Sequence, residues 1–310
     1  MSRIHEALKK AAQERSAQTA NRTVSDLVNL SVPEIAVETV SVSRQHADER
    51  VGLGEKTVTG VLQFEEFAKR CPHTAWKIDP RTSVFSAQMH DPGGAEKFRT
   101  LRSRLYQIAA AQPLKKILIT STMPAEGKTF VAANLAQSFI RQEDPRVLLI
   151  DADLRASRLH LHLGAPEKPG LSDYLRGDSD MFQITQVGTM GNLCLIPGGR
   201  EVSNPSELLH SARMKHLLDR MSAIFDWIIL DSPPALAVHD ASILADMCDG
   251  MLFVVQAGST DFEIAAKVSA EFHDKNVLGV VLNRAAKGDT YGGYYSGYGS
   301  EKDVASKETK

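Results

Sequence analysis

Short apolar runs rich in valine, isoleucine and leucine recur from about residue 116 onward. They read KILITS, RVLLID, NLCLIPG, WIILDSPP, MLFVVQA and VLGVVLN. Between them lie stretches with apolar residues at helical spacing, such as TFVAANLAQSFIRQ, PSELLHSARMKHLLDRMSAIF and DFEIAAKVSAEFHD. Buried strands that alternate with helices are typical of a parallel sheet covered on both faces. Together with the preceding helix AEKFRTLRSRLYQIAAA, the pattern predicts an α/β three-layer sandwich with a mostly parallel sheet over residues 91–286.

The rest of the chain lacks this alternation. Residues 1–15, MSRIHEALKKAAQER, repeat apolar positions at helical spacing opposite basic ones, which predicts an amphipathic helix. That helix is either a solvated start or an element that docks on a partner. Residues 16–90 lose regular periodicity and are predicted to be a poorly ordered linker, with a short ordered piece around residues 61–67. Residues 287–310 are predicted to be a flexible tail.

Composition narrows the class of protein. The chain has 310 residues, of which 43% are hydrophobic and 24% are charged, as in ordinary soluble globular proteins. The net charge of -2 argues against a dominant polyanion partner, so we expect no nucleic acid. Cys71, Cys194 and Cys248 form no disulfide framework or metal motif, which indicates a reducing cytosol. No apolar run approaches the roughly 18 residues of a spanning helix, so we expect any membrane contact to go through a partner.

A phosphate-binding sequence follows the first predicted strand. Gly127, Lys128 and Thr129 come after KILIT and open a helix. In such a loop the glycine lets backbone N–H groups face phosphates, the lysine reaches the β/γ oxygens, and the threonine hydroxyl ligates magnesium. The strict pattern has a glycine where Thr122 stands, but the strand before and the helix after favour the phosphate loop over a chance turn. The predicted ATP contacts are Glu126, Gly127, Lys128, Thr129 and Phe130.

Carboxylates end two further strands. Asp151 and Asp153, with Arg155, end the run VLLIDADLR, and Asp231 ends WIILD. Because parallel strands end at the same edge of a sheet, these acids are expected beside Lys128, where a buried carboxylate must be solvated, paired or bound to metal. One such aspartate is usually a helix cap, whereas three around one phosphate loop predict a Mg-ATP site. Asn283 ends the last strand and is either an adenine contact or a turn residue.

Four of the six tyrosines lie near the C-terminus, in DTYGGYYSGYGSEKD: Tyr291, Tyr294, Tyr295 and Tyr298. Glycine and serine separate them, so they can bury little. Tyr294 lies eleven positions after Asn283, and an extended chain of that length reaches roughly 36–40 Å, enough to enter its own or a neighbouring nucleotide site. The tail is either a sticky disordered end or a tethered phosphate acceptor, and the Mg-ATP site favours the acceptor.

The motifs STMPAEGKT, LLIDADLR and IILDSPP, with the terminal tyrosines, resemble the bacterial tyrosine kinases (BY-kinases) of polysaccharide biosynthesis. The resemblance covers residues from about 86 to 300 and includes DPGGAEKFRTLRSRL, GLSDYLRG, NPSELL and VVLNR. The opening MSRIHEALKKA is similar to kinases found beside exosortase-linked exopolysaccharide systems. The resemblance implies a P-loop NTPase fold of the deviant Walker A, MinD-like type.

The resemblance also implies roles for single residues. Lys128 would contact phosphate, Asp151 would accept the tyrosine proton, and Arg155 would sense phosphate or a neighbouring subunit. Magnesium would be held by Thr129, Asp153 and Asp231. Glu96, Arg99 and Arg102 match an ExxRxxR motif through which family members form rings, although they could be only an intrahelical Glu–Arg pair. Ala125 departs from the family glycine, at a cost of about 1 kcal/mol if that position needs a positive φ.

The implied activity is that of a non-specific protein-tyrosine kinase, which uses ATP and Mg²⁺ to phosphorylate its own tail and regulates exopolysaccharide or capsule synthesis, chain length or export. The implied partners are further copies in a ring, a separate membrane-embedded chain-length determinant that activates the kinase, and a phosphotyrosine phosphatase. The protein would then be cytoplasmic, at the inner face of the membrane. Two alternatives stay open. A partition or division-site ATPase would have a second lysine early in the loop, where Met123 stands, and a nucleotide-controlled scaffold is the other.

Overall fold

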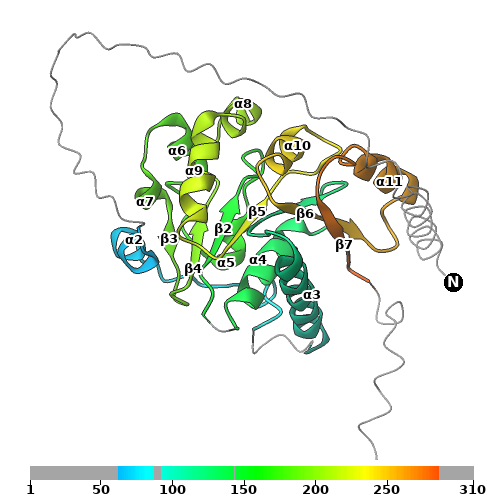
Figure 1. Ribbon diagram of the computed structural model, residues 1–310, viewed down its shortest axis with the longest axis horizontal. Coiled ribbons are helices and arrows are strands. Elements are labelled where there is room, and N and C mark those ends of the chain that lie inside the picture. The colour runs from blue at the N-terminus through cyan, green and yellow to red at the C-terminus, as the bar shows by residue number, and fades with distance from the viewer. Residues whose placement is uncertain (1–61, 87–91, 143, 286–310) are drawn as a thin grey trace, which may run out of the picture. The chain divides into compact units, whose positions relative to one another are not determined.

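The computed structural model describes residues 62–86, 92–142 and 144–285. Its sheet has seven strands: β1 (Lys116–Ser121), β2 (Val147–Asp151), β3 (Gln186–Val187), β4 (Leu193–Ile196), β5 (Trp227–Asp231), β6 (Gly250–Gln256) and β7 (Val277–Asn283). Their order is β3-β4-β2-β5-β1-β6-β7, and every neighbouring pair is parallel except β3–β4 (Figure 1). The six predicted apolar runs each form a strand, which confirms the α/β sandwich. The two-residue strand β3 is too short to show a pattern in the sequence.

Helices cover both faces of the sheet. One face carries α3 (Pro92–Ala111), α4 (Lys128–Phe139) and α5 (Leu159–Leu163). The other carries α2 (Phe64–Arg70), α6 (Leu171–Arg176), α7 (Met181–Ile184), α8 (Pro205–Leu209), α9 (Ala212–Ser222), α10 (Asp240–Ala245) and α11 (Phe262–Ala270) (Figure 1). The central strands β1, β2, β4 and β5 are apolar on both sides because both sides are buried, whereas the edge strand β7 is partly exposed.

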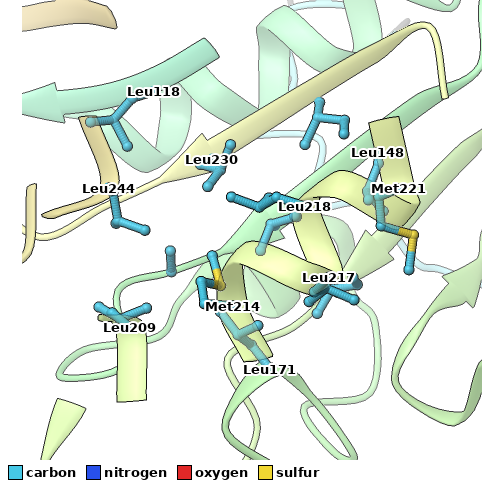
Figure 2. Packing of buried hydrophobic residues seen from close by; sticks show 14 of the residues in the cluster. Leu118, Leu148, Leu171, Leu209, Met214, Leu217, Leu218, Met221, Leu230 and Leu244 are labelled. Carbon is cyan, nitrogen blue, oxygen red and sulfur yellow. The ribbon is translucent and has the colours of Figure 1, made fainter. Parts of the chain in front are cut away.

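Helix α9 shows how the second layer packs. Its apolar residues recur at i, i+3, i+4 and i+7 and meet leucines from three strands of the sheet (Figure 2). These residues are Met214, Leu217, Leu218 and Met221 on the helix, and Leu118, Leu148 and Leu230 on β1, β2 and β5. The single helical stretch predicted over residues 205–225 is broken at Ser211, whose hydroxyl accepts the Met214 N–H and begins α9.

The predicted linker over residues 16–90 is wrong for residues 62–86, because these pack on the domain. The short ordered piece expected around residues 61–67 is α2. The Phe67 side chain is 0% exposed and meets the Phe225 ring edge-to-face, with centroids 5.7 Å apart. Burial of a phenylalanine contributes about 1.5–3 kcal/mol, enough to hold a helix of seven residues against the second layer.

Residues 72–86, which we term the strap, cross from one face of the sheet to the other. The strap begins beside the edge strand β3, where Val187 donates its N–H to the Pro72 carbonyl and accepts the Thr74 N–H. The Trp76 side chain is buried and packs directly on the backbone of Gly188, the residue that follows β3. A Cβ on Gly188 would lie 2.5 Å from the Trp76 ring. The strap therefore covers the polar edge of the sheet, a position where an unpaired strand invites aggregation.

The far end of the strap contacts α4, the helix that follows the phosphate loop. Ser83 donates its hydroxyl to Gln137 Oε1 at 2.8 Å, and the Val84 N–H donates to Asn134 Oδ1 at 2.9 Å. The Asn134 amide also donates to the carbonyl of Phe130, in the first turn of the helix, at 2.9 Å. All three polar side chains are buried, so their hydrogen bonds fix the position of the strap on α4.

Candidate active site

The register of the sheet brings the predicted acids together. Asp151 on β2 lies directly opposite Asp231 on β5, and Asp231 lies opposite Ile119 on β1, the strand that leads into the phosphate loop. Because these strands are parallel, all three end at one edge, where ligands bind in sheets of this kind. Lys128 begins α4 at that edge and faces the carboxylates.

The phosphate loop has the backbone conformation that its chemistry requires. Gly127 has a φ of 95°, and a Cβ there would lie 2.1 Å from the Asn283 amide nitrogen, so any other residue would be strained and would displace that amide. Ala125 also has a positive φ, of 66°. The position where the family usually has glycine therefore holds alanine in a left-handed conformation, at a cost of about 1 kcal/mol.

The Glu126 side chain braces this loop and is not among the residues that line the cavity. One oxygen accepts the Met123 N–H at 2.7 Å, and the other accepts a hydrogen bond from the Thr260 hydroxyl beyond β6. Both carboxylate oxygens are therefore engaged within the protein, and the expectation that Glu126 contacts ATP stays a prediction. The side chain fixes the loop against the sheet, which a sequence pattern alone does not reveal.

Lys128 is the cation of the site. Its Nζ lies 2.8 Å from Asp153 Oδ2 and 4.0 Å from Asp231 Oδ1. Burial by itself lowers the pKa of Lys128, but the negative charges of Asp231, Asp153 and Asp151 outweigh it, and the net pKa is raised. The ammonium group therefore stays charged, as contact with phosphate oxygens requires.

Asp231 is a buried carboxylate, and neither oxygen accepts a hydrogen bond of ordinary geometry from the described residues, although the Thr129 hydroxyl lies close enough to affect its pKa. Its side chain is 1% exposed. Burial raises its pKa to about 7, and Asp151 and Asp153 act in the same direction, whereas Lys128 and the Thr129 hydroxyl lower it. Two buried carboxylate oxygens without donors cost free energy, and a bound cation would remove that cost. This observation fits the predicted magnesium role of Asp231.

Asp151 is held differently from Asp231. Its Oδ2 accepts hydrogen bonds from the Ser157 hydroxyl at 2.7 Å and from the backbone N–H groups of Arg158 and Leu159, both at 3.0 Å. Burial raises its pKa to about 6, a value that suits a general base, while these donors act to lower it. Among the described residues, its other oxygen, Oδ1, accepts only the Asp153 N–H at 3.2 Å and keeps a lone pair for a proton. The role of Asp151 as proton acceptor stays a prediction.

Arg155 is positioned by two residues that the sequence did not point to. Its Nε donates to Asp240 Oδ2 at 2.8 Å, and one terminal nitrogen donates to the Ser206 hydroxyl at 2.8 Å. Asp240, at the start of α10, is fully buried, and the hydrogen bond to it raises the pKa of Arg155. The guanidinium is thus fixed at the cavity wall, whereas its role toward phosphate or a neighbouring subunit stays a prediction.

A cavity of about 730 Å³ opens at this edge of the sheet. Lys128, Thr129 and Phe130, the predicted nucleotide contacts, line it together with Asp153, which was predicted to hold magnesium. Their contacts with a nucleotide and a metal stay predictions. Asn283 lines the cavity too, but its amide donates to the Glu126 carbonyl at 2.7 Å and its oxygen accepts the Arg284 N–H at 2.9 Å. Its amide thus holds the loop through one N–H, and the adenine contact stays a prediction. The remaining lining residues are Pro124, Ala125, Gly127, Arg155, Ala156, Arg158, His162, Pro233, Pro234, Ala237, Val238 and Arg284.

The donors at the cavity suit magnesium better than a metal held by protein alone. Within residues 62–86, 92–142 and 144–285, no three His, Cys, Asp or Glu side chains converge as a preformed metal site. Magnesium commonly takes one or two carboxylates and completes its shell with water and phosphate oxygens. Asp153 and Thr129 at the lining, with Asp231 buried behind Lys128, are the residues that would hold it.

The three residues matched to a ring-forming motif do not act alike. Glu96 and Arg99 form an exposed ion pair on α3, with Oε2 and Nη1 2.9 Å apart. Arg102 instead turns toward α4 and donates to the Ser138 carbonyl at 2.5 Å. The intrahelical Glu–Arg pair is present, and the helix holds its neighbour through Arg102. The oligomeric role of all three stays a prediction.

Several predicted features lie outside the described residues: the amphipathic helix over residues 1–15, the linker up to residue 61, and the four tail tyrosines Tyr291, Tyr294, Tyr295 and Tyr298. In the part of the chain that the structure describes, no helix is long and apolar enough to span a membrane.

Known proteins resemble this chain in sequence and in fold. Residues 117–306 match the model of the CobQ/CobB/MinD/ParA nucleotide binding domain. The chain is 37% identical over 204 residues to tyrosine-protein kinase YwqD of Bacillus subtilis, and the match covers 64% of this chain and 86% of that one. The chain belongs to the bacterial tyrosine kinases. This confirms the predicted family and its nucleotide-binding P-loop fold.

Two further comparisons show how far the kinase likeness extends. Tyrosine-protein kinase wzc of Salmonella typhimurium is 38% identical over 207 residues, which cover 64% of this chain but 28% of that protein. The kinase domain of Escherichia coli tyrosine kinase ETK matches with a TM-score of 0.58 and 33% identity, over 64% of this chain and 80% of that domain. The bacterial tyrosine kinase domain is thus the shared unit, and the chain spans less than a third of relatives such as wzc.

Proposed function

We propose that this protein is an ATP- and Mg²⁺-dependent autokinase that phosphorylates tyrosines of its own C-terminal tail, Tyr291, Tyr294, Tyr295 and Tyr298. One observation carries the proposal most directly. A charged, largely buried Lys128 stands between Asp153 and the orphaned carboxylate of Asp231 at the cavity. This is the arrangement of positive and negative groups that a bound Mg-nucleotide needs.

The chain's own residues would divide the work of phosphoryl transfer. Lys128 would neutralise phosphate oxygens, and the backbone N–H groups around Gly127 would orient them. Asp153, Thr129 and Asp231 would hold magnesium, which when bound neutralises the charge that builds up between the β- and γ-phosphates. Phosphoryl transfer needs mainly positioning and charge neutralisation, so a tethered tail at high local concentration suits it as an acceptor.

The decisive experiment incubates the pure full-length chain with Mg-ATP and probes for phosphotyrosine. Two altered proteins are treated in parallel: Lys128→Met and a chain that ends at Lys287. Lys116→Met, at the start of β1, is the control for the loss of a lysine outside the cavity. We expect phosphotyrosine in the wild type and in Lys116→Met only. ATP hydrolysis without phosphotyrosine would overturn the kinase proposal and favour an ATPase that positions cellular cargo.

Assembly and partners are proposed from the family resemblance. Copies of the chain would form a ring through Glu96, Arg99 and Arg102, and a separate membrane protein that sets polysaccharide chain length would activate the kinase at the inner face of the membrane. Each phosphotyrosine adds about -1.5 to -2 charges, so four add roughly -6 to -8 and should loosen the ring by repulsion. Light scattering before and after ATP treatment measures this, and an unchanged mass would contradict it.

A further inference from the structure

The cavity is lined by more residues than nucleotide binding accounts for. The proposed nucleotide contacts lie on the phosphate loop, the first turn of α4 and the end of β7. A second group of lining residues comes from two other segments: Arg158 and His162 beside α5, and Pro233, Pro234, Ala237 and Val238 in the loop after β5. Lys128 and Asp153, which carry the charges proposed for the reaction, line the same cavity as both groups.

The loop after β5 gives this second group an apolar wall. Its four lining residues carry no polar side-chain atom, and two of them, Pro233 and Pro234, are buried. The loop is fixed beside the phosphate loop because the Ala235 N–H donates to the Ser121 carbonyl at 2.8 Å and the Leu236 N–H donates to the Thr122 carbonyl at 3.2 Å. A rigid apolar surface next to a phosphate site suits a flat apolar ring.

Arg158 adds a positive charge to the lining of the same cavity. Its backbone N–H is bonded to Asp151, which fixes its place in the chain. Its exposed guanidinium, however, has no ion-pair or hydrogen-bond partner among the residues that the structure describes. Arg155, three residues earlier, differs because the buried Asp240 already neutralises it. Arg158 is therefore free to pair with an incoming anion.

We infer that Arg158 and the lining residues of the loop over 233–238 form an acceptor slot, which binds the ring of the tyrosine to be phosphorylated. The inference rests on the proposed function and names the residues that select its acceptor. The ring packs on the apolar wall, and its hydroxyl points toward the end of the cavity that Lys128 and Asp153 line. Serine and threonine lack the ring and gain nothing from the wall, so the slot favours tyrosine.

The transfer balances with the groups already named. The phenolic oxygen forms a bond to the γ-phosphorus of ATP, and the bond from that phosphorus to the β–γ bridging oxygen breaks. ADP leaves with the electron pair of the broken bond, and the phenolic proton passes to a carboxylate of the site. The product side chain carries about two negative charges, which Arg158 offsets.

The test measures autophosphorylation of the full-length chain at saturating Mg-ATP, together with the dissociation constant for ATP and the thermal unfolding temperature. Ala237→Trp fills the slot from an exposed wall position, and Arg158→Gln removes the charge. Their controls are Leu236→Trp, on the same loop but outside the cavity lining, and Arg176→Gln, an exposed arginine elsewhere.

Both slot variants should lose at least about tenfold in autophosphorylation rate while ATP affinity stays within about twofold. Arg158→Lys should recover part of the rate because it keeps the charge, and both controls should match the wild type. If Ala237→Trp unfolds, Arg158→Gln and Arg158→Lys decide the question by themselves.

Three results would overturn the inference. Slot variants that phosphorylate as fast as their controls would refute the slot and leave the proposed function standing. A parallel loss of ATP affinity would assign this part of the cavity to the nucleotide. Absence of phosphotyrosine in the wild type would refute the proposed function, and the slot with it.

Discussion

Replacing Lys128 with methionine should destabilise the nucleotide-free protein in a way that depends on pH. The ammonium group lies 2.8 Å from Asp153 and 4.0 Å from Asp231, and the lysine side chain is 13% exposed. Methionine has a similar length and no charge, so the substitution isolates the electrostatic role of the lysine. The three strand-end acids are then left without their shared cation.

The size of the effect follows from the geometry. Two unit charges 2.8 Å apart attract by roughly 6 kcal/mol at an effective dielectric constant of about 20. The cost of burying the lysine offsets part of this attraction. Breaking a buried pair by removing one partner typically costs about 3–5 kcal/mol, because the remaining charge is left uncompensated. We expect a loss in this range in the free energy of unfolding at about pH 8.

The direction of the pH dependence comes from the two raised carboxyl pKa values. Asp231 and Asp151 have pKa values of about 7 and about 6 in the folded protein, against an ordinary value of 3.8. The folded protein therefore keeps protons that the unfolded chain releases, and these groups lower the stability as pH rises from about 4 to about 7. Without Lys128 both pKa values rise further. The loss of unfolding free energy caused by Lys128→Met should therefore be largest at about pH 8. It should be at least about 1 kcal/mol smaller at about pH 5, where the Asp151 and Asp231 carboxyl groups are neutral.

Urea unfolding at the two pH values measures this difference. The fluorescence of Trp76 and Trp227, which are 6% and 5% exposed, reports unfolding. Lys116→Met is the matched control. Lys116 begins β1, the strand that leads into the phosphate loop, and its Nζ lies 3.8 Å from Asp249 in a more exposed pair. Such a pair contributes about 0–1 kcal/mol. A loss for Lys128→Met that equals the control, or that is the same at both pH values, would refute the reasoning.

Two further predictions concern packing and the phosphate loop. Phe67→Ala should lower the free energy of unfolding by about 3–5 kcal/mol because the Phe67 side chain is 0% exposed. Phe262→Ala, at a position 48% exposed, should change that free energy by less than about 0.5 kcal/mol. A similar loss for both variants would show that α2 does not anchor the strap. Gly127→Ala should weaken ATP binding by at least about tenfold, because its Cβ would lie 2.1 Å from the Asn283 amide at a φ of 95°. Gly191→Ala, at a φ of 67° with nothing within 4 Å, should leave ATP affinity unchanged in equilibrium titrations, and equal effects of the two variants would contradict the steric argument.

The strap shows why part of the domain boundary escaped prediction. Its anchor, Trp76, is an isolated apolar residue in a polar stretch, so no period of two or 3.6 marks it. The backbone that it packs against, at Gly188, lies far along the chain. A segment that gains its order from distant contacts looks like a linker when it is read alone.

The residues of the site were also predicted only in part. Lys128, Asp153 and Thr129 were predicted because a phosphate loop and strand-end acids are local patterns, and the structure places all three at the cavity. Glu126 and Arg102 were predicted by position in a motif, yet their side chains bond to Thr260 and to the Ser138 carbonyl. A motif gives the residue type at a position, whereas the direction of its side chain depends on neighbours from other elements.

The sequence by itself determined the sheet, the phosphate loop and the acids at the strand ends, because each depends on residues near one another in the chain: buried runs of one length, a glycine before a helix, a carboxylate after a strand. Only the tertiary structure decided that Asp151 Oδ2 accepts three hydrogen bonds while Asp231 has no ordinary hydrogen-bond partner among the described residues. It also decided that Asp240 holds Arg155, and that Arg158 lines the same cavity as an apolar loop. These differences arise from burial and from partners on distant segments, and they set charge and pKa at the site.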